Sequence, residues 1–209
     1  MFNLILTQTI SHAFRKGGGA FGTLAFYVLV VTMFTFALNP QTLHEHAGAV
    51  MCVALLLASI TSLPLLFERD HEDGTLEQLL LQPVALEILV LAKITGLWVS
   101  IMLPILLMSP VIAAMANLDS AQTLQALTML LLASPSIVAI GAVTAALTLG
   151  NKRGGLLQAL VALPLYTPVL IFAASISGQG AVLFLSAIAC ASVPLACMVC
   201  ASLVRLSQE

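Results

Sequence analysis

The chain has 209 residues, of which 60% are hydrophobic and 8% are charged, and its formal net charge is −2. Soluble domains carry about 25% charged residues, so this composition excludes a water-soluble enzyme and a large extramembrane domain. The lack of a general basic surface excludes a nucleic-acid-binding protein. The sequence therefore indicates an all-α integral membrane protein that crosses the bilayer several times.

The first element expected along the chain is an amphipathic helix over residues 2–16. Apolar side chains recur there at helical spacing: Leu6, Ile10, Ala13 and Phe14. Such a helix lies in the membrane interface, and the three glycines of residues 17–19 would follow it as an elbow. A frayed N-terminus is the alternative.

Six apolar segments follow, each long enough to cross an apolar core of about 30 Å as a helix. Their expected bounds are 20–38, 48–66, 88–116, 123–149, 156–176 and 181–204. The alternating segments of about ten residues that are typical of a membrane β-barrel do not occur. We therefore expect one transmembrane domain over residues 1–209.

The positions of the basic residues predict the orientation of these spans. All basic residues outside the spans lie in one set of connections and tails: Arg15, Lys16, Arg69, Lys152, Arg153 and Arg205. The opposite loops, 39–47, 117–122 and 177–180, contain neither Lys nor Arg. Positive residues stay on the cytoplasmic side, so both termini are expected in the cytoplasm, with Lys93 near the cytoplasmic end of the third span.

The loop between the second and third spans, residues 67–83, is the most polar part of the chain. It holds five of the nine acidic residues: Glu68, Asp70, Glu72, Asp73 and Glu77. Gly74 supplies a turn, and Thr75 and Gln78 have capping-box spacing, which predicts a short helix that begins near Leu76 and ends before Pro83.

This short helix would present an apolar face. Leu76, Leu79 and Leu80 fall on one side of it, and the loop itself cannot bury them. A protein partner or the lipid headgroup layer must therefore cover this face.

No catalytic residue is predicted. Apart from Lys93, the expected spans contain no Asp, Glu, Lys, Arg or His. This argues against a proton-driven transporter. A sodium site built from backbone carbonyls would escape this test. A phosphate-binding loop needs Gly-Lys-Ser/Thr, and none of the three lysines follows a glycine. Any ATP hydrolysis must therefore come from another subunit.

Two groups of residues resemble ligand sets only weakly. Cys197 and Cys200 lie one helical turn apart, and His44 and His46 lie in the loop after the first span. Either pair could bind a metal or haem iron. We favour small apolar cysteines in a helix and a solvated turn after Pro40, and we predict no metal site.

Prolines and the single tryptophan mark the interiors of the spans. The prolines expected there are Pro64, Pro104, Pro110, Pro135, Pro164 and Pro168. Each can shape a hinge or simply contribute to packing. Trp98 fits an anchor at the membrane interface.

Several of these segments together resemble the CcmB family, haem exporter protein B, the ABC transporter permease of cytochrome c maturation. The matching residues run over about 60–175: 67–70, 73–79, 90–93, 103–104, 109–110, 135, 146–148, 150, 152–155, 163–165, 168 and 170–173. The connection 177–180 is shorter than is usual in that family.

The resemblance implies six transmembrane helices of the type-2 ABC exporter kind and a permease subunit in the bacterial inner membrane. It further implies coupling of ATP hydrolysis to release of a haem-loaded periplasmic chaperone, to haem export, or to both. The implied partners are two copies of a CcmA-type ATPase, a second permease copy, CcmC- and CcmD-type subunits and a CcmE-type chaperone. Haem would be a substrate, and ATP would bind the partner ATPase.

The resemblance also assigns a role to the acidic loop. Its residues would form a coupling helix that docks on the ATPase: Asp70, Asp73, Gly74, Thr75, Leu76, Glu77, Gln78, Leu79 and Leu80. Lys152 and Arg153 are candidates for a second cytoplasmic contact, with a role as topology anchors favoured. The alternatives are an acidic loop that only faces solvent, an exporter of another hydrophobic substrate, and a membrane scaffold that transports nothing.

Overall fold

The computed structural model describes residues 2–15, 19–67, 70, 74, 85–149, 154–174 and 179–206. Every element within these ranges is helical: α1 (Phe2–Arg15), α2 (Gly19–Ala37), α3 (Pro40–Ser62), the 3-10 helix η1 (Leu63–Leu66), α6 (Leu86–Met115), α7 (Ser120–Leu147), α8 (Gly154–Ala174) and α9 (Gln179–Leu206). The expected all-α class is confirmed.

Six of these helices are long and apolar enough to span a membrane. The spanning stretches are Gly19–Ala37, Glu45–Ser62, Leu86–Met115, Ser120–Leu147, Gly155–Ala173 and Gly180–Arg205. They agree with the expected spans to within a few residues, and the chain is a multi-pass membrane protein. The helix expected at the N-terminus is present as α1, and its place at the membrane surface stays a prediction.

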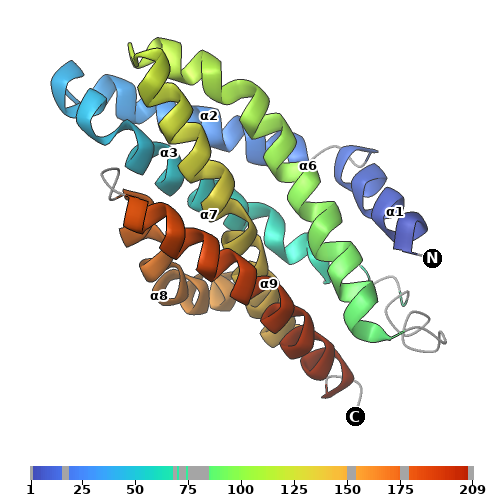
Figure 1. Cartoon of the computed structure of the whole chain (residues 1–209). Coiled ribbons are helices and arrows are strands. Elements are labelled where there is room, and N and C mark those ends of the chain that lie inside the picture. Colours follow the sequence, from blue (N-terminus) through green and yellow to red (C-terminus); the bar gives the residue numbers. More distant parts are fainter. Residues whose placement is uncertain are drawn as a thin grey trace.

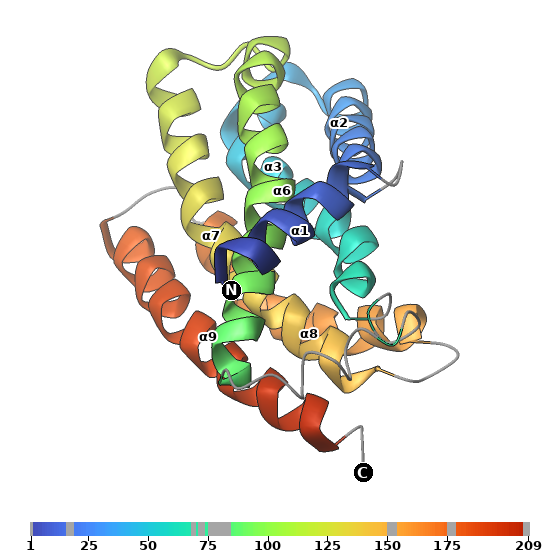
Figure 2. The same ribbon diagram turned by 90° about the vertical axis from the view of Figure 1, so that its right-hand side faces the viewer.

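The helices form one bundle (Figure 1), in which the α2–α3 and α6–α7 connections lie at the same end. The first residues of α6 and the C-terminal end of α9 lie at the opposite end, and α1 crosses the outside of α6 obliquely (Figure 2). An exposed ion pair joins α6 and α9 at that end, with 3.4 Å between Arg205 Nη2 and Glu87 Oε1.

Helix α7 occupies the centre of the bundle, in contact with α3, α6, α8, α9 and η1. Its buried face consists largely of small residues, among them Ala133, Ser134, Ser136, Ala139, Gly141, Ala142, Ala145 and Ala146. Small side chains let helix backbones approach closely, which is the main source of packing energy between helices in a membrane. At Gly141 an added Cβ would lie 2.3 Å from Leu63 Cδ2 and 2.8 Å from the Tyr166 hydroxyl oxygen.

Proline determines where α3 begins and ends. Pro40 lies in the first turn of the helix, where its missing N–H costs no hydrogen bond. Pro64 has no N–H and cannot continue the α-helical hydrogen-bond pattern at the other end, although Leu63 before it keeps helical backbone angles (φ −62°, ψ −37°). The α-helix therefore ends at Ser62 and continues only as the 3-10 turn η1.

The early start of α3 corrects one sequence prediction. Residues 44–46 were expected in a solvated turn after Pro40, and the structure places them inside α3. The predicted turn is wrong because Pro40 begins a helix here. The side chains of Glu45 and His46 are exposed, as a solvated segment would be.

The prolines inside α6 and α7 do not interrupt these helices, and serines compensate for two of them. Pro110 and Pro135 each leave the carbonyl four residues earlier without its helical N–H donor. The Ser109 hydroxyl donates to the Leu106 carbonyl oxygen over 2.8 Å, and the Ser134 hydroxyl donates to that of Leu131 over 2.8 Å. The Ser-Pro pairs thus satisfy backbone oxygens that lipid could not solvate.

Candidate functional site

The structure describes only part of the predicted docking segment. Asp70 and Gly74 are described, and Gly74 has a φ of 68°, the left-handed conformation that glycine adopts most easily. Seven docking residues lie outside the described residues: Asp73, Thr75, Leu76, Glu77, Gln78, Leu79 and Leu80. The same holds for Lys152 and Arg153, so these assignments stay predictions.

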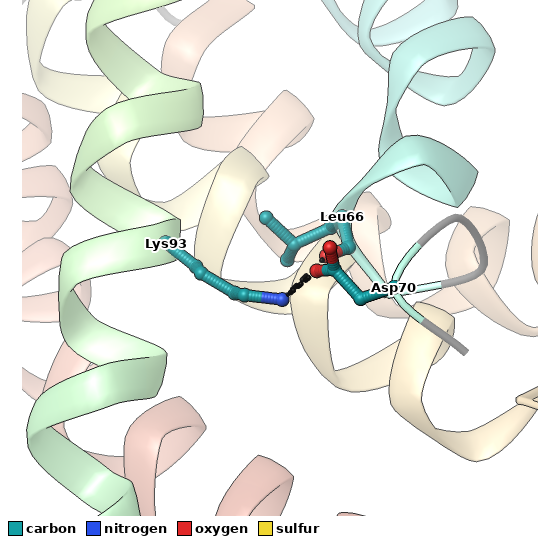
Figure 3. Close-up of polar contacts among 3 residues, drawn as sticks. All are labelled: Leu66, Asp70 and Lys93. Carbon is teal, nitrogen blue, oxygen red and sulfur yellow. Dashed lines mark hydrogen bonds and ion pairs between the residues drawn. The ribbon is translucent and has the colours of Figure 1, made fainter. Parts of the chain in front are cut away.

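Polar interactions gather where the chain leaves η1. Lys93 extends from α6 toward Leu66 and Asp70 (Figure 3). We call Leu66, Phe67 and Asp70 the loop root. The Lys93 ammonium forms an ion pair with the Asp70 carboxylate and lies 3.4 Å from the Leu66 carbonyl oxygen. It also lies 5.4 Å from the centroid of the Phe67 ring, close enough for a cation–π interaction.

Burial makes this cluster unusual. Lys93 is 6% exposed and is the only charged residue among the buried residues that the structure describes. It lies seven positions after Leu86 in α6, about 10 Å along the helix axis. A buried ammonium without a partner is costly, so its pairing with Asp70 compensates for lost hydration.

The sequence placed Lys93 near one end of the third span but did not reveal its partner. Asp70 precedes it by 23 residues, and no helical or strand period relates the two positions. One signal was available: a lysine inside a span requires a partner, and acidic residues precede it at Glu87 and in the loop before α6.

Helix α1 packs against α6 close to this cluster. An added Cβ at Gly96 would lie 2.9 Å from Thr9 Cβ and 3.1 Å from Thr9 Cγ2. Gly96 follows Lys93 by three positions, so both lie on neighbouring parts of the same side of α6. One turn of α6 therefore contacts both the N-terminal helix and the loop root.

Trp98 forms a contact between two helices, and its place as an interfacial anchor stays a prediction. Its indole N–H donates to the Ser134 hydroxyl oxygen over 3.0 Å, which links α6 to α7. The same hydroxyl donates to the Leu131 carbonyl oxygen. Ser134 thus joins two helices while it compensates for Pro135.

Within the described residues, no three His, Cys, Asp or Glu side chains gather in a way that could hold a metal ion. Cys197 and Cys200 are buried in α9. In α3, His46 is exposed, whereas the side chain of His44 lies outside the described residues. No cofactor site can be assigned from these groups.

Known proteins resemble this chain over almost its whole length. The CcmB protein family matches residues 1–207. Heme exporter protein B of Rhodobacter capsulatus is 39% identical over 179 residues, which cover 85% of this chain and 82% of the relative. The protein of the same name from Pseudomonas aeruginosa is 43% identical over 173 residues, 82% of this chain and 78% of the relative.

A third relative extends the similarity to both ends. Heme exporter protein B of Paracoccus denitrificans is 36% identical over 213 aligned positions, covering 97% of this chain and 98% of the relative. The residues that carry the resemblance in the sequence therefore reflect common ancestry over the full chain. The chain belongs to the CcmB family.

Proposed function

We propose that this chain is the permease subunit of an ABC transporter complex that delivers haem for the biogenesis of c-type cytochromes. The observation that carries the proposal is its similarity, over almost the whole chain, to proteins named Heme exporter protein B. The six spanning helices agree with a permease. The whole chain, residues 1–209, would form one permease domain.

The energy for this work would come from a partner. The sequence has no phosphate-binding loop, so a CcmA-type ATPase, present in two copies, would hydrolyse ATP. A second copy of the permease and CcmC- and CcmD-type subunits would complete the complex. A CcmE-type chaperone would receive haem on the periplasmic side.

The orientation of the bundle assigns an end to each partner. The protein would lie in the bacterial inner membrane, and the distribution of basic residues supports a cytoplasmic location for both termini and for the loop after η1. The ATPase would therefore meet the end that holds the first residues of α6 and the C-terminus of α9. The α2–α3 and α6–α7 connections would face the periplasm and the haem chaperone.

Docking on the ATPase would use the loop between η1 and α6. An exposed leucine face with acidic residues beside it suits a helix that docks in a groove of a partner. The residues proposed for it are Asp70, Asp73, Gly74, Thr75, Leu76, Glu77, Gln78, Leu79 and Leu80. Lys152 and Arg153 would add a second cytoplasmic contact.

Movement of this loop would then reach the rest of the bundle through the two helices that flank it. When the ATPase pair closes on ATP, the loop would move, and with it the ends of α3 and α6. Their rearrangement would change the periplasmic surface that holds the chaperone. The haem-loaded chaperone would be released so that haem reaches apocytochrome c.

Docking is tested by placing an acidic residue in the leucine face and a basic residue at its acidic edge. The double substitution Leu76→Asp and Glu77→Lys should abolish co-purification of the ATPase, because it places a charge in the apolar contact and inverts its acidic edge. Co-purification is measured from membranes in which both proteins are tagged.

The control places the same acid-to-base change at the other end of the bundle. Glu45→Lys, at an exposed position of α3, should leave both membrane insertion and co-purification unchanged. Normal co-purification of the Leu76→Asp, Glu77→Lys variant would contradict docking through this loop.

A further inference from the structure

A lysine at position 93 is not explained by stability alone. A hydrophobic side chain of similar size would fill the same space beside η1 without the desolvation cost of a buried ion pair. A topology anchor would extend its amine to the interface. The Lys93 ammonium instead turns toward the bundle, where it contacts the carbonyl oxygen of Leu66 and the carboxylate of Asp70.

All partners of this ammonium within the described residues come from one short stretch of chain. Leu66 and Phe67 are buried at 3% and 1% exposure, and the Asp70 side chain is 32% exposed. The loop root therefore runs from the interior of the bundle to its edge and contacts Lys93 at three points. A single side chain of α6 thus fixes the position of the segment from which the docking loop begins.

We propose that Lys93 and Asp70 are positioning residues that fasten the loop root to α6, so that a displacement of the docking loop moves α6 with it. This inference rests on the proposed function, in which the loop docks on the ATPase. The arrangement resists separation because removal of the carboxylate would leave the ammonium buried and unpaired. Force on the loop would therefore move α6 instead of stretching the connection.

The fastening itself is tested by limited proteolysis with trypsin of the chain purified in detergent. Lys93→Met should accelerate cleavage after Arg69 by about fivefold or more, because the freed loop root opens locally more often. Cleavage after Lys152 and Arg153 reports general loosening and should not change. Lys93→Arg, which keeps the positive charge, should cleave at the wild-type rate.

The transmission of movement is tested with Lys93→Met, the variant used for proteolysis, which leaves every residue of the proposed docking contact unchanged. The Asp70 side chain is 32% exposed, so water can solvate its carboxylate once the lysine is gone, and the variant should bind the ATPase and hydrolyse ATP within about twofold of the wild type. Holocytochrome c, measured by haem staining, should nevertheless fall about tenfold, because loop movement no longer reaches α6. The control removes the exposed pair between α6 and α9 through Arg205→Met and Glu87→Gln, which should leave the holocytochrome yield unchanged.

Two results would overturn the inference. One is an unchanged rate of cleavage after Arg69 in Lys93→Met, which would show that the pair does not hold the loop root. The other is a normal holocytochrome yield in Lys93→Met, which would show that the pair serves stability only. Failure of the proposed function would be seen in a different experiment, because a strain without this chain would then make normal cytochromes. In that case the proteolysis would still decide whether Lys93 holds the loop root.

Discussion

Ser134 links several constraints of the bundle at one side chain. Its hydroxyl donates to the backbone oxygen left without a helical donor by Pro135 and accepts the indole N–H of Trp98 from α6. Removing the hydroxyl would leave two partly buried polar groups without this partner, in surroundings where lipid cannot replace it. A serine before a proline in a span is therefore a structural element and not a neutral small residue.

Ser134→Ala should destabilise the protein by about 1–2 kcal/mol, and Trp98→Phe should add little to a chain that already lacks the hydroxyl. The interaction energy between the two changes, from a double-mutant cycle of unfolding in mixed micelles, should be about 0.6 kcal/mol, as is usual for hydrogen bonds between membrane helices. Ser186→Ala is the matched control, because the exposed Ser186 donates only to Leu183 of its own helix. Strictly additive effects would contradict a hydrogen bond between α6 and α7.

At the scale of the elements, α1 is more than a surface helix. Thr9 lies against Gly96, where the absence of a side chain on α6 leaves room for it. The amphipathic pattern predicted a helix with one apolar face but did not identify what covers that face, because an amphipathic helix can lie on lipid or on protein. The structure shows that α6 contacts α1.

Gly96→Val should displace α1, because a branched side chain cannot occupy space already filled by Thr9. Hydrogen–deuterium exchange of residues 2–15 should become about tenfold faster, while exchange in α7 stays unchanged. Gly22→Val provides the control, since an added Cβ at Gly22 meets nothing within 4 Å. Equal protection of α1 in the Gly96→Val variant and in the wild type would show that the helix does not depend on this contact.

The ends of the elements show how far local sequence rules reach. The apolar runs and the polar connections located all six spans, because crossing a bilayer requires a long uninterrupted apolar helix. The prediction of a solvated turn after Pro40 was wrong, since a proline is compatible both with a turn and with the first turn of a helix. The second span was expected to run to residue 66 with Pro64 inside it, whereas the α-helix ends at Ser62. The packing of Leu63 against Gly141 required the tertiary structure.

The site was less predictable than the fold for a related reason. The acidic loop was visible from composition, whereas the pairing of Lys93 with Asp70 joins residues that no local pattern connects. Contacts of this kind depend on how η1 meets α6. The hydrogen bond by which Trp98 links α6 to α7 could not be predicted for the same reason.

At the scale of the whole molecule, the proposed function would divide two tasks between the two ends of the bundle. The end that holds the loop root and the beginning of α6 carries the ion pairs Lys93–Asp70 and Arg205–Glu87. The opposite end holds the α2–α3 and α6–α7 connections (Figure 1), which would offer a surface to a partner. This separation fits a subunit that receives movement on one side and changes its binding surface on the other.

The most direct test of this account follows haem in a bacterial strain that lacks the chain. Haem-stained c-type cytochromes and the haem-loaded periplasmic chaperone are measured in parallel, with and without a plasmid copy of the wild-type protein. The account predicts that holocytochromes disappear while the haem-loaded chaperone accumulates, and that the plasmid copy reverses both changes. Normal holocytochromes in the deletion strain would contradict it and would instead favour an exporter of another hydrophobic substrate.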